Sequence, residues 1–406
     1  MYARLGWRNV WRNPRRTAVI VTAMTIGVWC MIFLAGAMAG MYEGMIENSL
    51  STLTGHLQVH APGFRTDPVV EHSMDPDPVA GAFDKVLPPG SHYAFRVRVN
   101  AVVQNARHST AATLVGIQPE REAKVSFVKT GVTRGEYLEP GDARGILAGA
   151  ALAEDFETEI GKKLILVSQG AQGEIQSRAY RIRGLFHAEL EATEKQYVFV
   201  DMKSAQAMLE MGGQVSEAAV WLPDADLTPQ VVKDLSAELS ADRYEVADYK
   251  ELMPLITASI GVWDTFMIIW YLVVFVAMGF GIVNTILMAV MERMREFGLL
   301  KALGMKPRQI AGTVLAESAV VIVLGMVLGN LFGFLSVYAV SKTGIDLSAL
   351  AAGAERWALP RVIIPTIRFR DVWMADLVVI VLGLLVSLYP AMKAARTTPK
   401  DAMSDL

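Results

Sequence analysis

The sequence predicts an α-helical membrane protein with four transmembrane helices and an α+β extracytoplasmic domain inserted between the first and the second helix. The 406 residues are 52% hydrophobic and 19% charged, which is too apolar for an ordinary soluble chain and too polar for one embedded throughout. Long apolar runs near the start and in the last third of the chain flank a more polar central region. The predicted segments are an interfacial segment 1–16, transmembrane helices 17–42, 261–291, 310–341 and 372–391, an extracytoplasmic domain 43–260, a cytoplasmic coupling helix 292–309, an extracytoplasmic loop 342–371 and a cytoplasmic tail 392–406.

Arginines before the first apolar run predict its orientation. Arg4, Arg8, Arg12 and Arg15 recur at spacings of three and four, which places them on one face of a short interfacial helix, and Arg16 follows. Basic residues accumulate on the cytoplasmic side of membrane spans, so we expect a cytoplasmic N-terminus. Counting four spans puts the later basic residues on the same side, which predicts a cytoplasmic C-terminus and a multi-pass protein of the cell (inner) membrane. These residues are Arg293, Arg295, Lys393, Arg396 and Lys400.

The run 17–42 is predicted to be a retained anchor. About 25 apolar residues exceed the 7–15 of a signal-peptide core and match a membrane span. Small residues at 35–37 leave a cleaved secretory signal as the alternative.

The region 43–260 mixes strand-like and helix-like patterns, as in an α+β domain. Val97 and Val99 alternate with Arg96 and Arg98, which is the period of a half-buried strand. Strands are expected at 95–99, 163–167, 180–183, 195–200 and 218–222, helices at 148–157, 203–211 and 228–240, and turns at 88–90 and 170–173. The region follows a span with a cytoplasmic start, so it faces the extracytoplasmic side, and its length allows two lobes.

The segment 291–310 is predicted to be a short charged helix at the cytoplasmic membrane face. Apolar residues recur at helical spacing in Met294, Phe297, Leu300 and Leu303, as in an amphipathic helix. The charged residues are Glu292, Arg293, Arg295, Glu296 and Lys301. Gly304 is placed to end the helix in a left-handed conformation, and Pro307 prevents its immediate continuation. We expect this helix to contact a soluble partner that moves the spans.

Two features inside the spans add to this organisation. Gly325, Gly329 and Gly333 recur every four residues, and Gly36 with Gly40 forms a shorter series; such series allow helix backbones to approach closely. Glu317 lies about two turns into the third span, where an ionisable group is costly. We expect it to pair with a Lys or Arg at the inner face; a direct role in gating is the alternative.

Motifs for catalysis are absent from the sequence. The chain has no GxxxxGK[ST] phosphate loop, no HExxH and no GxSxG. His56 and His60 lack a third metal ligand, and Cys30 falls inside an apolar run, so we expect no metal site and no directly bound cofactor. The net charge of −3 gives no indication of nucleic acid as a partner. If the protein uses energy, another chain must supply it.

Several motifs resemble the four-span permeases of the MacB/FtsX-like superfamily of ABC transporters, most closely the lipoprotein-releasing LolC/LolE type. Residues 7–17 (WRNVWRNPRRT) resemble that family's approach to the first span, and residues 54–60 (TGHLQVH) its first extracytoplasmic strand. Residues 292–304 (ERMREFGLLKALG), including Gly298, resemble its cytoplasmic coupling segment, Glu317 its third span, and residues 389–399 (YPAMKAARTTP) its C-terminal end.

The resemblance implies a permease without its own ATPase motifs. Two copies of a cytoplasmic ABC ATPase would bind ATP and Mg²⁺, dock on the coupling segment, and act on this chain paired with a second permease chain, identical or related. MacB-type pumps carry a fused ATPase at the N-terminus, whereas this chain starts at the membrane, which favours a separate one. The implied action is mechanotransmission, with a lipoprotein cargo taken from the membrane lipid and passed to a periplasmic acceptor.

Large flexible and aromatic side chains of the first two spans suit a cavity for acyl chains in such a protein, with plain packing or lipid contact as the alternative. These candidates are Met24, Met31, Phe33, Met267, Trp270, Phe275 and Met278. The resemblance also leaves open a MacB-like export permease and an FtsX-like regulator of cell-wall hydrolases. A membrane-anchored sensor that needs no ATPase is a further alternative.

Overall fold

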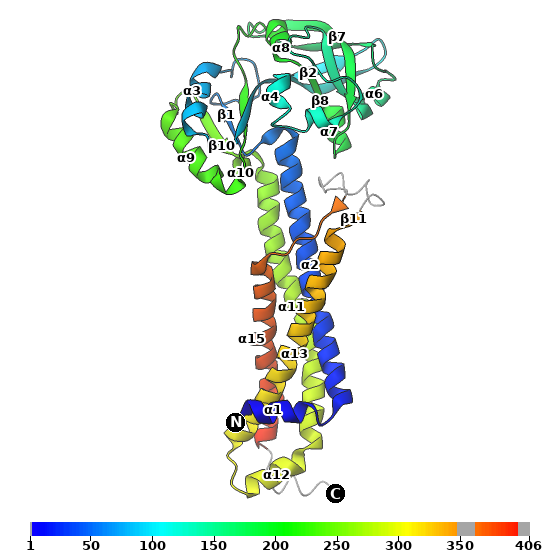
Figure 1. Cartoon of the computed structure of the whole chain (residues 1–406), viewed down its shortest axis with the longest axis vertical. Helices are drawn as coiled ribbons and strands as arrows, with labels where there is room; N and C mark the ends of the chain where they lie inside the picture. The colour runs from blue at the N-terminus through cyan, green and yellow to red at the C-terminus, as the bar shows by residue number, and fades with distance from the viewer. Residues whose placement is uncertain (1, 347–361, 397–406) are drawn as a thin grey trace. The chain divides into compact units, whose positions relative to one another are not determined.

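The chain forms four long apolar helices and an inserted α/β domain (Figure 1), seen in a computed structural model that describes residues 2–346 and 362–396. Among those residues, four helices are long and apolar enough to cross a membrane. They are α2 (Pro14–Ser49), α11 (Pro254–Glu292), α13 (Pro307–Ser341) and α15 (Phe369–Arg396). Lys400, used in the orientation argument, lies outside the described residues, as do residues 347–361 of the predicted loop.

All four helices are longer than the predicted spans, and α2 and α11 are the longest. Helix α2 has 36 residues and α11 has 39, or roughly 55 Å each at 1.5 Å per residue, against a hydrocarbon core of about 30 Å. A π-helical turn, Leu50–Thr54, continues α2 directly. Both helices therefore extend beyond the hydrocarbon region.

The N-terminal segment is two helices rather than one, which corrects the predicted arginine face. Helix α1 (Tyr2–Val10) ends before Arg12, and Pro14 begins α2. Proline has no N–H to donate but fits the first position of a new helix, so the chain turns here. Figure 1 shows α1 running across the long helices, and a Cβ at Gly6 would stand 3.0 Å from the carbonyl of Ala316 in α13.

The glycine series in α13 packs against α2 of the same chain. A Cβ built at Gly325, Gly329 or Gly333 would stand 2.3, 2.6 or 2.8 Å from the nearest side-chain atom of α2. Real Cβ atoms do not come so close, so these positions bring the two helices closer than any larger residue allows. The predicted close approach is confirmed.

Gly36 and Gly40 admit an extended segment beside α2, and Gly36 also admits a helix, since a Cβ there would stand 3.1 Å from Val337 of α13. They face the extended segment that follows β12 (Val362–Ile363) and precedes α15. The amide of Thr366 donates to the carbonyl of Gly36 at 3.0 Å, and a Cβ at Gly40 would collide with the carbonyl of Ile364. The small residues therefore admit an extended backbone, which can be tolerated among spans only where it is covered by protein.

A mixed sheet forms the extracytoplasmic domain, with neighbours in the order β10-β1-β9-β2-β3-β8-β5-β7-β4, while β6 pairs with β2 and β7. Its strands are β1 (Leu57–His60), β2 (His92–Gln104), β3 (Ser109–Ile117), β4 (Val132–Gly135), β5 (Gly145–Gly149), β6 (Lys163–Gln169), β7 (Ile175–Phe186), β8 (Tyr197–Asp201), β9 (Glu217–Trp221) and β10 (Glu245–Asp248). Its helices are α3 (Pro76–Val86), α4 (Pro119–Glu122), α5 (Val128–Gly131), α6 (Ala150–Asp155), α7 (Glu191–Gln196), α8 (Met202–Leu209), α9 (Thr228–Glu238) and α10 (Tyr249–Leu252). A short pairing of β11 (Ile345–Asp346) with β12 lies outside this domain.

Separate apolar cores divide the domain into two lobes that share the long strand β2. One core gathers residues of β1, β9, α3 and α9 around Phe83 and Val220. The other gathers residues of β5 to β8, α6 and α8 around Tyr180 and Leu164. The expected strands and helices are present with two corrections. Residues 148–149, predicted as helix, belong to β5, and the helix begins at Ala150. Residues 195–196, predicted as strand, belong to α7, and the strand begins at Tyr197.

Candidate coupling site at the α12 end of the bundle

Helix α12 (Met294–Ala302) connects α11 to α13 and ends as the sequence predicts. Gly304 has φ +94°; its amide donates to Lys301 O, and the amide of Met305 donates to Leu300 O, both at 2.9 Å. This pair of bonds is a Schellman motif, which needs a residue in the left-handed conformation. Pro307 then opens α13. The helix is therefore held in a fixed length and direction.

The two faces of α12 have opposite environments. Phe297 is 2% exposed and packs within the apolar core of the bundle, and Gly298 is also buried. Leu299 and Leu303, by contrast, are 63% and 77% exposed, and Leu300 is partly so. Phe297 therefore anchors the helix to the bundle rather than facing a partner, while the leucines leave an apolar strip uncovered.

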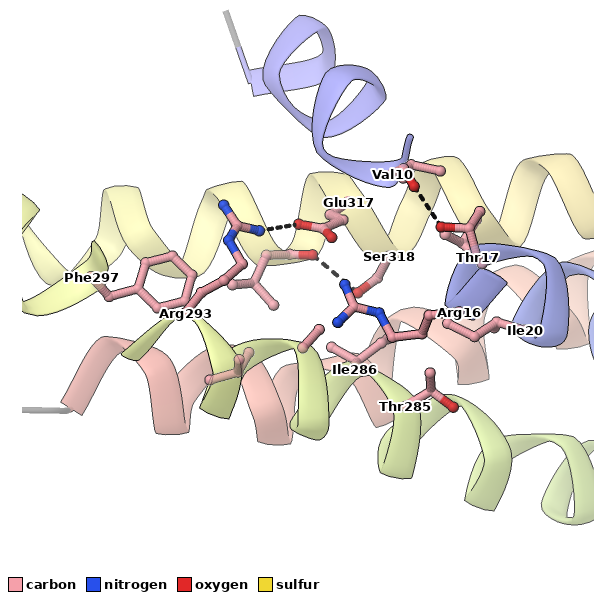
Figure 2. Close-up of a pocket in the computed structure, with 14 residues that line it drawn as sticks. Val10, Arg16, Thr17, Ile20, Thr285, Ile286, Arg293, Phe297, Glu317 and Ser318 are labelled. Atoms are coloured by element: carbon pink, nitrogen blue, oxygen red, sulfur yellow. Dashed lines mark hydrogen bonds and ion pairs between the residues drawn. The ribbon is translucent and has the colours of Figure 1, made fainter. Parts of the chain in front are cut away.

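Ion pairs fasten α12 to the surrounding helices. Arg12 donates to both carboxylate oxygens of Glu296, at 2.7 and 3.1 Å. Glu296 also accepts from Arg293 at 3.1 Å. Arg293 in turn donates to Glu317 of α13 at 2.9 Å, as Figure 2 shows. The hydrogen bond from Arg12 is the main cause that lowers the pKa of Glu296 to about 2.

A second pair joins α2 to α11. Arg16 donates to Glu292 at 2.8 Å. A small cavity of about 30 Å³ lies beside this pair, lined by Arg16, Thr17, Arg293 and Glu317 together with apolar residues of α2, α11 and α13. That volume and lining suit a single water. The expected pairing of Glu317 is confirmed, and its partner is Arg293.

The remaining coupling candidates lie along the same helix. Lys301 donates to the carbonyl of Ala395 near the end of α15, so α12 is bonded to that helix too. Arg295 has an exposed side chain. Contacts of α12 thus reach the α1–α2 turn, α13 and α15.

The acyl-chain candidates lie in different surroundings. Four of them, Met24, Met31, Phe275 and Met278, are buried in the packed core of the bundle. Met267 and Phe33 are partly buried and Trp270 is exposed. A groove of about 610 Å³ between α2 and α13 is instead lined by other residues: Val21, Thr22, Thr25, Ile26, Trp29, Leu328, Phe332, Leu335 and Ser336. An acyl-chain cavity formed by the seven candidates stays a prediction.

Sequence reasoning missed two sets of functional candidates. Arg12 and Arg16 pair with acidic residues more than 270 positions away, and the only signal was the opposite charge of the two segments. Asp376 of α15 accepts from the Asn330 amide at 3.0 Å; a carboxylate inside the fourth apolar run was a signal for it.

His56 and His60 bond to Leu222 N and to Gln58, and the described residues contain no cluster of three or more potential metal ligands.

Comparisons with known proteins cover both parts of the chain. Residues 17–238 match the MacB-like periplasmic core domain, and residues 267–399 match the FtsX-like permease C-terminal domain. The lipoprotein-releasing system transmembrane protein LolC of Xylella fastidiosa is 25% identical over 400 residues, covering 94% of this chain and 92% of that protein. The macrolide export ATP-binding/permease protein MacB of Chlorobium luteolum is 33% identical over 124 residues, 30% of this chain and 16% of that protein. The periplasmic region of MacB from Actinobacillus actinomycetemcomitans has a TM-score of 0.37 at 10% identity, covering 53% of this chain and 98% of that one.

Proposed function

Because the chain belongs to the MacB/FtsX-like family of ABC transporter permeases, we propose that it couples ATP hydrolysis by a separate ATPase to motion of its extracytoplasmic domain. Two copies of the ATPase bind ATP and Mg²⁺, and a second permease chain, identical or related, completes the transporter. The termini and α12 lie in the cytoplasm, and the protein resides in the cell (inner) membrane. The chain itself binds no cofactor.

The exposed leucine strip of α12 is the observation that carries this proposal. A soluble protein or loop seldom leaves neighbouring leucines uncovered unless a partner covers them. Phe297 is buried on the opposite face, and ion pairs of Glu296 and Arg293 bond the helix to the bundle. A partner that covers Leu299 and Leu303 and then moves therefore displaces α11, α13 and the α1–α2 turn together.

The proposed cargo is a lipoprotein, extracted from the outer leaflet and passed to a periplasmic acceptor. The support is the match to LolC proteins over nearly the full length of both chains, whereas the MacB match spans a short part. Membrane lipid surrounds the spans and is the source of this cargo.

The test is purification of the tagged protein from its native membrane in mild detergent, with mass spectrometry of the retained proteins and acyl chains. We expect an ABC ATPase and triacylated lipoproteins. An ATPase with a cell-wall hydrolase and no lipoprotein would overturn the cargo and support a regulatory role. Absence of any ATPase would overturn the coupling itself.

Variants of α12 sharpen this test. Replacing Leu299 and Leu303 with Asp removes two apolar contacts worth about 1.5–3 kcal/mol each when buried, so ATPase binding should weaken by about 100-fold or more while the yield of folded permease is unchanged. The exposed Ile175 of β7 offers a matched control, and Ile175→Asp should leave ATPase binding intact. Phe297→Asp should lower the yield of folded protein, because that side chain is buried.

A further inference from the structure

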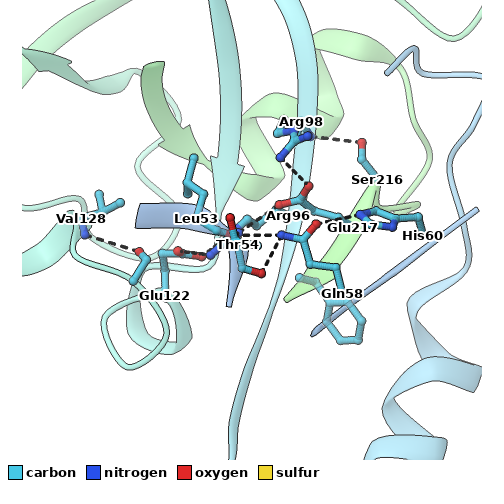
Figure 3. Close-up of polar contacts among 12 residues, drawn as sticks. Leu53, Thr54, Gln58, His60, Arg96, Arg98, Glu122, Val128, Ser216 and Glu217 are labelled. Carbon is cyan, nitrogen blue, oxygen red and sulfur yellow. Dashed lines mark hydrogen bonds and ion pairs between the residues drawn. The ribbon is translucent and has the colours of Figure 1, made fainter. Parts of the chain in front are cut away.

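Buried charges in the middle of the extracytoplasmic sheet form the most isolated polar cluster of the domain (Figure 3). Arg96 of β2 is completely buried, as are Glu122 of α4 and Glu217 of β9. The Arg96 guanidinium donates to both oxygens of Glu122, at 2.7 and 2.9 Å, and to Glu217 at 3.0 Å. Arg98 closes the cluster with a second pair to Glu217 at 3.1 Å.

The guanidinium also binds the end of α2. One of its N–H groups donates to the carbonyl of Leu53, in the π-helical turn that continues α2. The Gln58 amide donates to the same carbonyl at 3.1 Å and to Thr54 O at 2.8 Å. The last carbonyls of a helix lack partners within the helix and carry its negative end. Here a buried cation and an amide satisfy them.

The turn itself is embedded in the domain. The Leu53 side chain is 4% exposed and packs in a core with residues of β3, β5 and β8. Gly55, at φ +65°, donates to Leu50 O at 2.9 Å and ends the turn. The final turn of the helix is therefore held by apolar packing on one side and by Arg96 on the other.

The junction with α11 is made differently. The amide of Tyr249 donates to His56 O at 3.0 Å, and the nearby pair of Arg65 with Glu245 is about one-third exposed. Met253 then breaks the helical conformation, at φ −123° and ψ 60°, before Pro254 opens α11. Hydrogen bonds cross the break: Thr257 donates from its hydroxyl to Lys250 O at 3.2 Å and from its amide to Met253 O at 3.1 Å. This junction is therefore held by local backbone bonds, with no buried charge like Arg96 among these contacts.

A charged cluster is a costly way to fill a core, because apolar residues of similar volume often give equal or greater stability. What the planar guanidinium adds is direction: its fork binds Glu122 in two places and leaves further N–H groups at fixed angles for Glu217 and Leu53. The cluster thus specifies one orientation of the turn relative to three elements of the sheet.

We propose that Arg96 is a positioning residue that fixes the end of α2 to the sheet, so that displacement of α2 is carried into the extracytoplasmic domain. The fixed junction follows from the geometry of the domain, and the transmission rests on the proposed function.

The first test measures amide hydrogen exchange of the full chain in nanodiscs for Arg96→Lys and Tyr180→Phe. Lysine keeps the charge opposite Glu122 and Glu217 but cannot also hold Leu53 O, so exchange at residues 50–58 should rise about tenfold while residues 163–186 change by less than about twofold. Tyr180→Phe removes a 3.1 Å bond to Ser204 in the other core and should affect 163–186 but not 50–58. Unchanged exchange at 50–58, or an equal rise in both regions, would overturn the junction.

The second test uses the permease copurified with its ATPase, with exchange of the domain compared before and after addition of ATP and vanadate. In Arg96→Lys, the change in hydrogen exchange of the domain on adding ATP and vanadate should be smaller by about half or more. The rate of ATP hydrolysis should stay within about twofold of the unsubstituted complex. If the rate of ATP hydrolysis and the ATP-dependent change in hydrogen exchange fall by the same factor, the variant has simply lost structure. That result would overturn the transmitting role of Arg96. If the unsubstituted complex shows no ATP-dependent difference, the proposed coupling fails, and the first test still decides the junction.

Discussion

The ion pair between Arg293 and Glu317 makes a quantitative prediction about the α12 end of the bundle. The two charges are 2.9 Å apart and their side chains are 15% and 16% exposed. Coulomb's law with an effective dielectric constant near 20 gives about 6 kcal/mol at this distance, from which desolvation subtracts a large part. Exposed pairs couple by about 0–1 kcal/mol, and breaking fully buried ones costs about 3–5 kcal/mol. For this largely buried pair we expect a coupling energy of about 2 kcal/mol.

Of the two single substitutions, Arg293→Gln should lower the free energy of unfolding more than Glu317→Gln. Arg293→Gln leaves the Glu317 carboxylate without its cation two turns into a span, whereas Glu317→Gln leaves Arg293 with Glu296 still in place. Arg293→Gln should therefore destabilise by about 3 kcal/mol and Glu317→Gln by about 2 kcal/mol. The double variant should cost about 2 kcal/mol less than their sum.

The assay is equilibrium unfolding of the purified full chain in mixed micelles, followed by circular dichroism for all four members of the cycle. The control cycle uses Arg107 and Glu157, a 3.2 Å pair whose side chains are 78% and 67% exposed; its coupling should be below about 0.5 kcal/mol. A coupling for Arg293 and Glu317 as small as that of the control, or Glu317→Gln being the more harmful, would refute the reasoning.

Further predictions concern the glycine series and the buried histidine. In Gly329→Leu the new Cβ would stand 2.6 Å from Val28, so the helices must separate and thermal stability in detergent should fall by about 1–3 kcal/mol; an unchanged melting temperature contradicts the packing. Burial lowers the pKa of His60 to about 4 from an ordinary 6.5. As the pH falls, His60 of the unfolded chain is therefore protonated at a higher pH than His60 of the folded chain. Up to about 3 kcal/mol of folding stability is lost between pH 6.5 and pH 4 for this reason. His60→Gln should flatten that part of the stability profile and His92→Gln, at an exposed site, should not; equal profiles would show that His60 does not titrate as inferred.

Local patterns were sufficient to predict the features whose causes are local. The left-handed stop at Gly304 depends on one residue's backbone freedom, and the sequence predicts it correctly. The same holds for the strand around Val97 and Val99 and for the four apolar spans, because side-chain period and run length follow from the element itself. Pairing of Glu317 was predictable as well, since a lone carboxylate in a span needs a cation nearby.

Features set by tertiary contacts were not predictable in the same way. Nothing near Phe297 in the sequence distinguishes a side chain that faces a partner from one that packs inward, because α12 has apolar residues on both of its faces. Gly36 and Gly40 have the spacing of a helix–helix contact, yet Gly40 meets the extended segment at Ile364, and Gly36 meets both that segment and Val337 of α13. The spacing of the glycines predicts a close neighbour but not whether that neighbour is a helix or an extended segment. Arg96 had the pattern of an outward-facing strand residue, and its complete burial depends on Glu122 and Glu217 arriving from distant parts of the chain.

Helix α2 links the two clusters of charge described here. Arg16 at its start is bonded to Glu292 of α11, and the turn at its end is bonded to Arg96. Between these points the helix is unbroken from Pro14 to Ser49, and the glycine series of α13 holds it close along that part of its length. A helix resists compression and bending better than a loop does, since each turn is fixed by its own hydrogen bonds. Under the proposed function, displacement applied at α12 would reach the sheet through Arg16 and the unbroken helix α2.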